Sequence, residues 1–132
     1  MMHSILQPKG WAAPLGYANG IIARGRTVFI AGQIGWNAQA KIESDELIDQ
    51  VRQALANIVA VLGEAGAKPE HITSITWYLT DKRDYLAKLK QIGEVYRDVI
   101  GRNFPTMTAV QVVALIEDRA KVEIQAIAVI PD

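Results

Sequence analysis

Two stretches of the chain repeat apolar residues at the spacing of an α-helix. In residues 44–65 the apolar positions are Leu47, Ile48, Val51, Leu55, Ile58, Val59 and Leu62. In the second stretch, which starts near Asp84, they are Leu86, Leu89, Ile92, Tyr96 and Val99. This three-to-four-residue period predicts two amphipathic helices, the first capped by Ser44 and the second closed by Gly101.

Shorter apolar segments predict five strands. They cover residues 17–23, 27–31, 71–80, 107–116 and 121–130, and the charged turn Glu117-Asp118-Arg119 joins the last two. In the third strand, Ile75, Trp77 and Leu79 alternate onto one face. The residues before the first strand are expected to form an irregular arm. Gly32 and Gly35 are expected to interrupt regular structure after the second strand.

The order of these elements, β-β-α-β-α-β-β, predicts a single α+β domain over residues 1–132. Both helices would cover one face of a mixed sheet. The other face is not polar, because Ile127 and Val129 in the last strand alternate with Ile124 and Ala126. An apolar second face needs a cover, which another copy of the chain would supply. Oligomerisation is therefore expected, and a sheet that closes on itself is the alternative.

The amino-acid composition indicates which cellular compartment and which kinds of partner to expect. Half of the 132 residues are apolar and 21% are charged, as in an ordinary globular protein, and no cysteine is present. The lack of cysteine excludes disulfides and thiol chemistry and suits a reducing compartment. Fourteen basic and fourteen acidic residues cancel, so no nucleic-acid partner is expected. The sequence shows neither a signal peptide nor a membrane span, which predicts a soluble, cytoplasmic protein without a membrane partner.

Motifs for several common catalytic chemistries are missing from the sequence. It contains no phosphate-binding loop with lysine, no Gly-x-Ser-x-Gly elbow and no His-Glu-x-x-His zinc motif. Of the two histidines, His3 lies in the arm, where it is expected to be solvated, and His71 opens a strand, where a loop or capping role fits best. We therefore expect no metal and no cofactor.

One carboxylate stands out, because Glu123 interrupts an otherwise apolar strand. Burying a carboxylate costs several kcal/mol unless it is paired or protonated. Glu123 is therefore a candidate functional group. The alternative is an edge or interface salt bridge with an arginine or with Lys121.

Aromatic residues in loops are the next candidates for a functional site. Trp11, Tyr17 and Trp36 lie in glycine-rich segments rather than in regular elements. Aromatic rings on loops often wall a pocket, although packing against the neighbouring helix is the alternative. Gln33 would either bond a ligand or satisfy the backbone of a turn.

Seven segments, taken in order, resemble the Rid/YjgF family, whose older members were labelled L-PSP endoribonucleases. They are Gly16-Tyr17-Ala18-Asn19-Gly20, Val28-Phe29-Ile30-Ala31-Gly32-Gln33-Ile34, Gln50…Ala54-Leu55-Asn57-Ile58, Leu62…Ala65-Gly66-Ala67, Thr76…Tyr78-Leu79, Phe104-Pro105-Thr106-Met107-Thr108 and Val122-Glu123-Ile124-Gln125-Ala126-Ile127-Ala128-Val129. The similarity covers almost the whole chain. It implies a chorismate-mutase-like α+β fold and a homotrimer with three clefts between subunits. In the best-known members the cleft hydrolyses reactive enamines and imines, such as 2-aminoacrylate, to 2-keto acids and ammonia.

Three site positions carry over from this resemblance. The family's pocket tyrosine matches Tyr17, and the glutamate that positions water matches Glu123. Met107 stands where the family's arginine holds the substrate carboxylate. A thioether cannot form the bidentate, charge-assisted bond of a guanidinium, so the chain resembles branches that lack this arginine. Whether Arg24 or Arg102 replaces the missing charge is left open by the sequence.

Two hypotheses follow for the cleft. As an enzyme, it would hydrolyse an enamine or imine that is larger or less anionic than 2-aminoacrylate. Glu123 would orient the water, while backbone N–H groups near Met107, Thr108 and Ala109 would polarise the developing charge. The substrate pocket would be lined by Trp11, Tyr17, Gln33, Trp36, Met107, Thr108 and Ala109.

As a non-catalytic trimer, the protein would instead bind a small apolar or aromatic ligand, or hold other proteins. Ribonuclease activity is disfavoured by the zero net charge and by the lack of a catalytic histidine pair.

Overall fold

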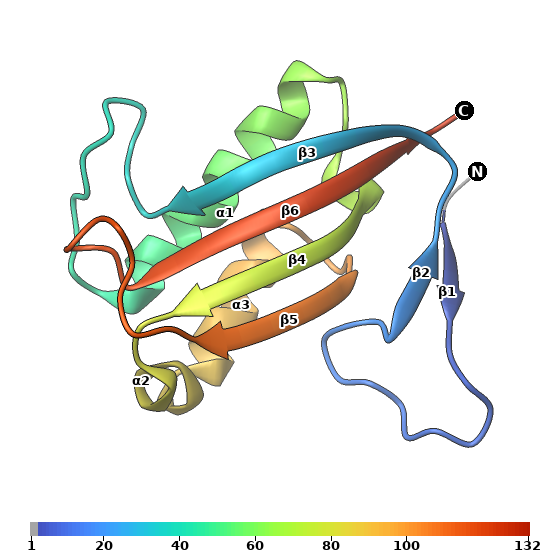
Figure 1. The fold of residues 1–132 in the computed structure, drawn as a ribbon, viewed down its shortest axis with the longest axis horizontal. Helices are drawn as coiled ribbons and strands as arrows, with labels where there is room; N and C mark the ends of the chain where they lie inside the picture. Colours follow the sequence, from blue (N-terminus) through green and yellow to red (C-terminus); the bar gives the residue numbers. More distant parts are fainter. Residues whose placement is uncertain (1–2) are drawn as a thin grey trace.

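A sheet of four strands carries its long helices on one face (Figure 1). The computed structural model describes residues 3–132, so Met1 and Met2 of the predicted domain lie outside the described residues. The elements along the chain are β1 (Ser4–Leu6), β2 (Gly20–Ile22), β3 (Gly25–Ile34), α1 (Leu47–Glu64), a 3₁₀ turn η1 (Pro69–His71), β4 (Ile72–Leu79), α2 (Lys82–Ala87), α3 (Leu89–Val99), β5 (Thr106–Gln111) and β6 (Val122–Pro131). The predicted α+β architecture with a mixed sheet is confirmed.

The strand order in the main sheet is β3-β6-β4-β5. Strand β6 runs antiparallel to both β3 and β4, whereas β5 runs parallel to β4. The expected tight turn between the last two strands is therefore wrong, because β4 lies between them and residues 112–121 form the crossing loop. The physical reason is the helical crossover after β4, which delivers the next strand parallel to β4 at its free edge.

The apolar residues that repeat at helical spacing in residues 44–65 lie on the side of α1 that faces the core. Val51, Leu55 and Ile58 are completely buried, and they pack in one cluster with Ile75 of β4 and Ile124 of β6. Burying a Leu, Ile or Val side chain stabilises a fold by about 1.5–3 kcal/mol. The predicted inward face of residues 71–80 is also confirmed, since Trp77 and Leu79 belong to the same cluster.

The helix termini differ in detail from the sequence expectations. Helix α1 begins after Glu46, and Ser44 lies before this cap, where its hydroxyl accepts the Glu46 N–H and donates to Asp49. The second predicted helix is two helices that meet at Lys88. The start of the first is fixed by Asp81, whose carboxylate accepts the N–H groups of the next turn.

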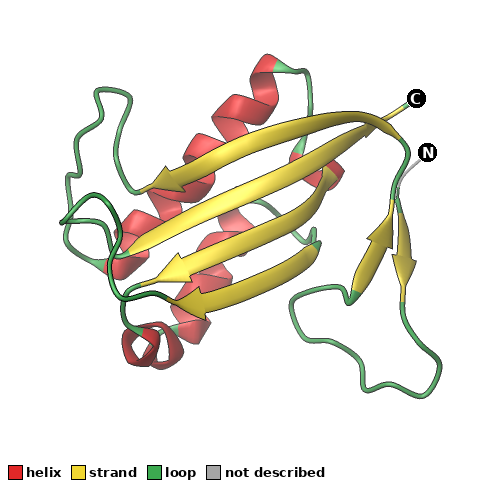
Figure 2. Cartoon of the chain, viewed as in Figure 1, coloured by secondary structure: helices red, strands yellow, loops and turns green. Residues whose placement is uncertain are grey.

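The N-terminal region is more regular than expected, because β1 and β2 pair as a small antiparallel sheet beside the main one (Figure 2). Strand β3 is also longer than expected and includes Gly32 and Gln33. Pairing with β6 is interrupted by a register shift between Ile30 and Gln33, which includes Gly32, and resumes at Gln33. A β-bulge accommodates the irregularity that the glycine suggested.

The second face of the sheet is apolar only in part, because Thr76, Tyr78 and Gln125 share it with the apolar residues of the last strand. Phe29 is 77% exposed there, and Ile127 and Val129 are half-buried. No element of residues 3–132 covers this face in Figure 1. In the same range, no helix combines the length and the apolar character needed to cross a membrane.

Two glycines at the end of α1 allow a matched stability test. Gly63 lies inside the helix with nothing within 4 Å of an added Cβ, whereas Gly66 has φ +69°. Gly63→Ala is expected to raise the free energy of unfolding by about 0.5–1 kcal/mol, because alanine loses less backbone entropy on folding. Gly66→Ala is expected to lower it by about 1–2 kcal/mol through left-handed strain. Urea denaturation of both variants checks these signs, and a stabilising Gly66→Ala would contradict them.

Candidate functional site

A cavity of about 460 Å³ lies between α3 and the edge strand β5. Its lining comes from α2, α3, β4, β5 and two loops, and consists of Leu15, Gly16, Tyr17, Trp77, Tyr85, Leu89, Ile92, Gly93, Tyr96, Arg97, Phe104, Met107 and Ala109. Most of these side chains are apolar or aromatic, and only Arg97 carries a charge. The volume falls in the range of small-molecule sites in proteins.

The register of the strands shows that two of the predicted site residues face this cavity. Met107 and Ala109 of β5 lie opposite Ile75 and Trp77 of β4, whose side chains are buried on the helix side of the sheet. Because alternate residues of a strand share a face, Met107 and Ala109 also face the helices. The Met107 side chain packs against the main core cluster.

Tyr17 reaches the same cavity from the loop between β1 and β2. The Ala18 N–H donates to the Pro105 carbonyl at 3.0 Å, and Ala18 forms an isolated bridge with Thr106. These contacts fix the loop against the start of β5. The structure therefore brings together Tyr17, Met107 and Ala109.

Aromatic rings in the lining of the cavity pack against one another. Tyr96 and Phe104 stack with ring centroids 5.8 Å apart, and Trp77 meets Tyr85 edge to face at 6.4 Å. The Tyr96 hydroxyl donates to the Asn103 carbonyl, and burial raises the pKa of this phenol. Burial also raises the pKa of Tyr85. Both phenols are therefore neutral hydrogen-bonding groups at neutral pH.

Glu123 lies on the opposite face of the sheet. Its strand neighbours Val122 and Ile124 are fully buried toward the helices, so Glu123 points to the uncovered face, where it is half-buried. Gly32 makes room for it, because a Cβ at that position would lie 2.7 Å from the carboxyl carbon Cδ. Within residues 3–132 of one chain, Glu123 forms no ion pair with Lys121 or an arginine, and a salt bridge across an interface stays a prediction.

The other predicted pocket residues are spread over the chain. Thr108 lies opposite Thr76, on the face of Glu123. Gln33 donates to the Ala31 carbonyl at 3.1 Å, as in the backbone-satisfying alternative. Trp36 packs beside a small core cluster, and Trp11 is 62% exposed on the arm.

The histidines behave as structural groups. His71 Nδ1 accepts the Lys68 N–H at 2.9 Å, which confirms its capping role. His3 is not simply solvated, because its Nε2 lies 3.1 Å from the His71 carbonyl oxygen. Across the described part of the chain, no cluster of three or more His, Cys, Asp or Glu could hold a metal ion.

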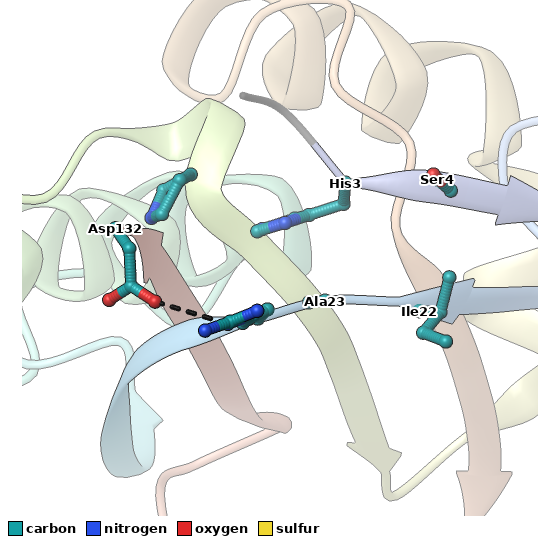
Figure 3. Close-up of a pocket in the computed structure, with 7 residues that line it drawn as sticks. His3, Ser4, Ile22, Ala23 and Asp132 are labelled. Atoms are coloured by element: carbon teal, nitrogen blue, oxygen red, sulfur yellow. Dashed lines mark ion pairs between the residues drawn. The ribbon is translucent and has the colours of Figure 1, made fainter.

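A second cavity of about 460 Å³ lies where β2 leads into β3 and meets the end of β6. Figure 3 shows its lining, with Asp132 paired to Arg24 at 3.4 Å and His3 facing them. It contains none of the predicted pocket residues. The Arg24 side chain is 93% exposed and does not line the first cavity of the same chain.

Sequence reasoning missed the basic residue of the first cavity. Arg97, one turn after Gly93 on α3, lines the cavity with Met107, while Arg102 lines a different one. The available signal was spacing, because Leu89, Gly93 and Arg97 recur every four residues on one side of the helix.

Comparison with known proteins assigns the chain to a family. Residues 10–130 match the family model Endoribonuclease L-PSP. A 2-iminobutanoate/2-iminopropanoate deaminase of Capra hircus is 34% identical over 105 residues, which make up 79% of this chain and 73% of that protein. A protein of the conserved Rid family from Yersinia pestis superposes with a TM-score of 0.84 at 29% identity, over 98% of this chain and 100% of that chain.

A solved structure of E. coli TdcF with bound serine is also similar, with a TM-score of 0.68 at 33% identity over 96% of this chain and 98% of that chain. The family match, the relatives and the shared fold agree with the resemblance drawn from the sequence. The chain therefore belongs to the endoribonuclease L-PSP family, also known as the Rid/YjgF family.

Proposed function

We propose that this protein is a cytoplasmic homotrimer that hydrolyses a reactive enamine or imine to a carbonyl compound and ammonia. The observation that carries the proposal is Glu123, a carboxylate without an ion pair in residues 3–132 that lies over Gly32 on the uncovered sheet face. Relatives named 2-iminobutanoate/2-iminopropanoate deaminase support this reaction class.

The chemistry needs one water molecule and one group that accepts a proton. Glu123 takes a proton from water as the water oxygen adds to the carbon of the C=N bond, giving a carbinolamine. That proton passes to nitrogen and completes the neutral carbinolamine. The carbinolamine hydroxyl then gives its own proton to nitrogen, through Glu123, as the C–N bond breaks, so that ammonia leaves and the carbonyl forms. N–H groups on the free edge of β5 would polarise the substrate, since an edge strand leaves part of its backbone unpaired.

A trimer would unite groups that lie apart in one chain. Met107 and Tyr17 line the cavity on the helix side of the sheet, and Glu123 lies on the other side. Contact between the uncovered face of one copy and the β5 edge of the next would bring these groups into one cleft. The exposed Phe29 and its neighbours supply apolar area for that contact.

The test is direct observation of imine hydrolysis. Imines of pyruvate, 2-oxobutanoate and phenylpyruvate, generated in a stopped-flow mixer by an amino-acid oxidase, are expected to decay faster with the protein than in buffer. Ammonia should form in equal amount to the carbonyl product. Decay at the buffer rate for every imine would contradict the proposal, provided that size measurements show the protein folded and assembled.

A second candidate function is favoured by Met107, which is a packing residue rather than a carboxylate-binding cation. In this case the trimer binds a small apolar or aromatic ligand, or holds other proteins, without turning anything over. A ligand retained through purification, combined with unaccelerated imine decay, would select this function over hydrolysis.

A further inference from the structure

We propose that the cavity between α3 and β5 binds a carboxylate that is carried on an aromatic or bulky apolar body, and that Arg97 binds the carboxylate group. The assignment of this ligand as the substrate rests on the proposed function. The binding site itself rests on the geometry of one chain, and can be tested without any turnover.

The size of the cavity favours a ligand larger than a three-carbon compound. Its volume is about 460 Å³. A cavity of about 150 Å³ in another protein is large enough to hold benzene. The present cavity therefore has room for a ring together with a short chain that ends in a polar group.

The lining favours an aromatic or bulky apolar body. Trp77, Tyr85 and Phe104 present rings to the cavity, and Met107 adds a flexible thioether. Rings gain contact energy from edge-to-face and stacked neighbours, and thioethers pack favourably against aromatic edges. A small polar ligand would leave these surfaces exposed to water.

The charge of the lining favours an anion. Arg97 is the single charged residue around the cavity, so its field is not offset by a lining carboxylate. Within residues 3–132 the Arg97 side chain has no ion pair and no hydrogen bond. Its guanidinium donors are therefore available, and a fork of N–H groups matches a carboxylate.

Gly93 positions this guanidinium. A Cβ at residue 93 would lie 3.3 Å from Arg97 Nη1, so the arginine folds back over the glycine along the cavity wall. The other arginines considered from the sequence are directed elsewhere, with Arg24 paired to Asp132 and Arg102 lining a separate cavity. The cation at this site thus comes from α3, the helix that directly precedes the strand of Met107.

The experiment compares an acid with its neutral analogue. Binding of 3-phenylpropanoate and 3-phenylpropanamide is measured by titration calorimetry at pH 7. The wild-type protein is expected to prefer the acid by about 3–10-fold, because Arg97 is exposed and solvent screens its interaction with the carboxylate. Arg97→Gln should remove this preference while leaving amide binding within about threefold.

Two variants separate charge from packing. Arg83→Gln makes the same change on an exposed arginine that does not line the cavity, and should keep the acid preference. Phe104→Leu should weaken both ligands by a similar factor, since it removes ring contact and leaves Arg97 in place.

Three results would overturn the inference: no binding of the acid at millimolar concentration, equal binding of acid and amide, or an acid preference that survives Arg97→Gln. None of them depends on hydrolysis. If imine decay is accelerated but the acid preference is absent, the ligand assignment fails and the proposed reaction stands. If the acid preference is present but imine decay is not accelerated, the proposed reaction fails and the ligand assignment stands.

Discussion

Replacing Glu123 with glutamine is expected to lower kcat for imine hydrolysis by about 10²–10⁴-fold, which is the usual contribution of a positioned general base. Glutamine keeps the length and the hydrogen-bonding capacity of the side chain but cannot accept the proton of the attacking water. Because Glu123 forms no ion pair within the described chain, its loss should change the free energy of unfolding by less than about 1 kcal/mol. Stopped-flow imine decay and urea denaturation measure the two effects separately.

Two further variants make this result specific. Glu94→Gln on the exposed side of α3 removes the same charge away from Gly32 and should leave kcat unchanged. Gly32→Ala keeps the carboxylate but inserts a methyl group 2.7 Å from its Cδ, so the Glu123 side chain must turn away. It should lower kcat nearly as much as Glu123→Gln. Unchanged turnover in Glu123→Gln would exclude this residue as the base.

The largest effect on stability is expected at Gln50, which is 1% exposed in the centre of the fold. Its amide nitrogen donates to the carbonyls of Ser44 and Arg119 at 3.0 Å, and its oxygen accepts the Lys121 N–H at 2.8 Å. Gln50→Leu would leave these three backbone groups without their partner, each at a cost of about 1 kcal/mol or more. We expect a loss of about 3–5 kcal/mol, measured by urea denaturation.

A matched control lies on the same helix. Gln53 is half-buried, and its amide bonds only to Asn57 one turn later. Gln53→Leu should therefore cost less than about 1 kcal/mol. Similar losses in the two variants would show that the bonds of Gln50 to the 112–121 loop do not stabilise the fold.

The parts of the fold that the sequence predicted are those in which a local pattern coincides with burial. Leu55 and Ile58 repeat at helical spacing because one side of α1 faces the sheet, and Ile75 and Trp77 alternate because one side of β4 faces the helices. Local periodicity reports such faces directly. The helix-on-sheet layer could therefore be inferred before any strand partner was known.

Strand partners and strand ends depend on distant residues, and here the predictions failed. The order β6-β4-β5 is decided by the crossover through α2 and α3, which no local pattern encodes. Strand β3 continues past Gly32 because Gln33 and Ile34 pair again with Ile124 and Glu123 of β6. A glycine that weakens a strand in isolation is tolerated when pairing over long distances compensates for it.

For the site, sequence reasoning identified residues but could not place them in space. Tyr17 and Met107 line one cavity of the chain, whereas their part in a cleft between subunits, and the position of Glu123 relative to them there, stay predictions. Arg97 was missed because a basic residue on a helix is ordinarily solvated, and only the packing of α3 beside β5 gives it a role.

The attachment of the loop between β1 and β2 has a consequence for the local stability of that loop. One wall of the cavity belongs to the core, but the wall that contains Tyr17 is tied to the main sheet by contacts such as the bond from Ala18 to Pro105. Strand β1 is exposed along its whole length. We therefore expect the amide protons of this loop to exchange with solvent faster than those of α3 and β5, because segments with few buried contacts open locally at a lower free energy than the whole fold.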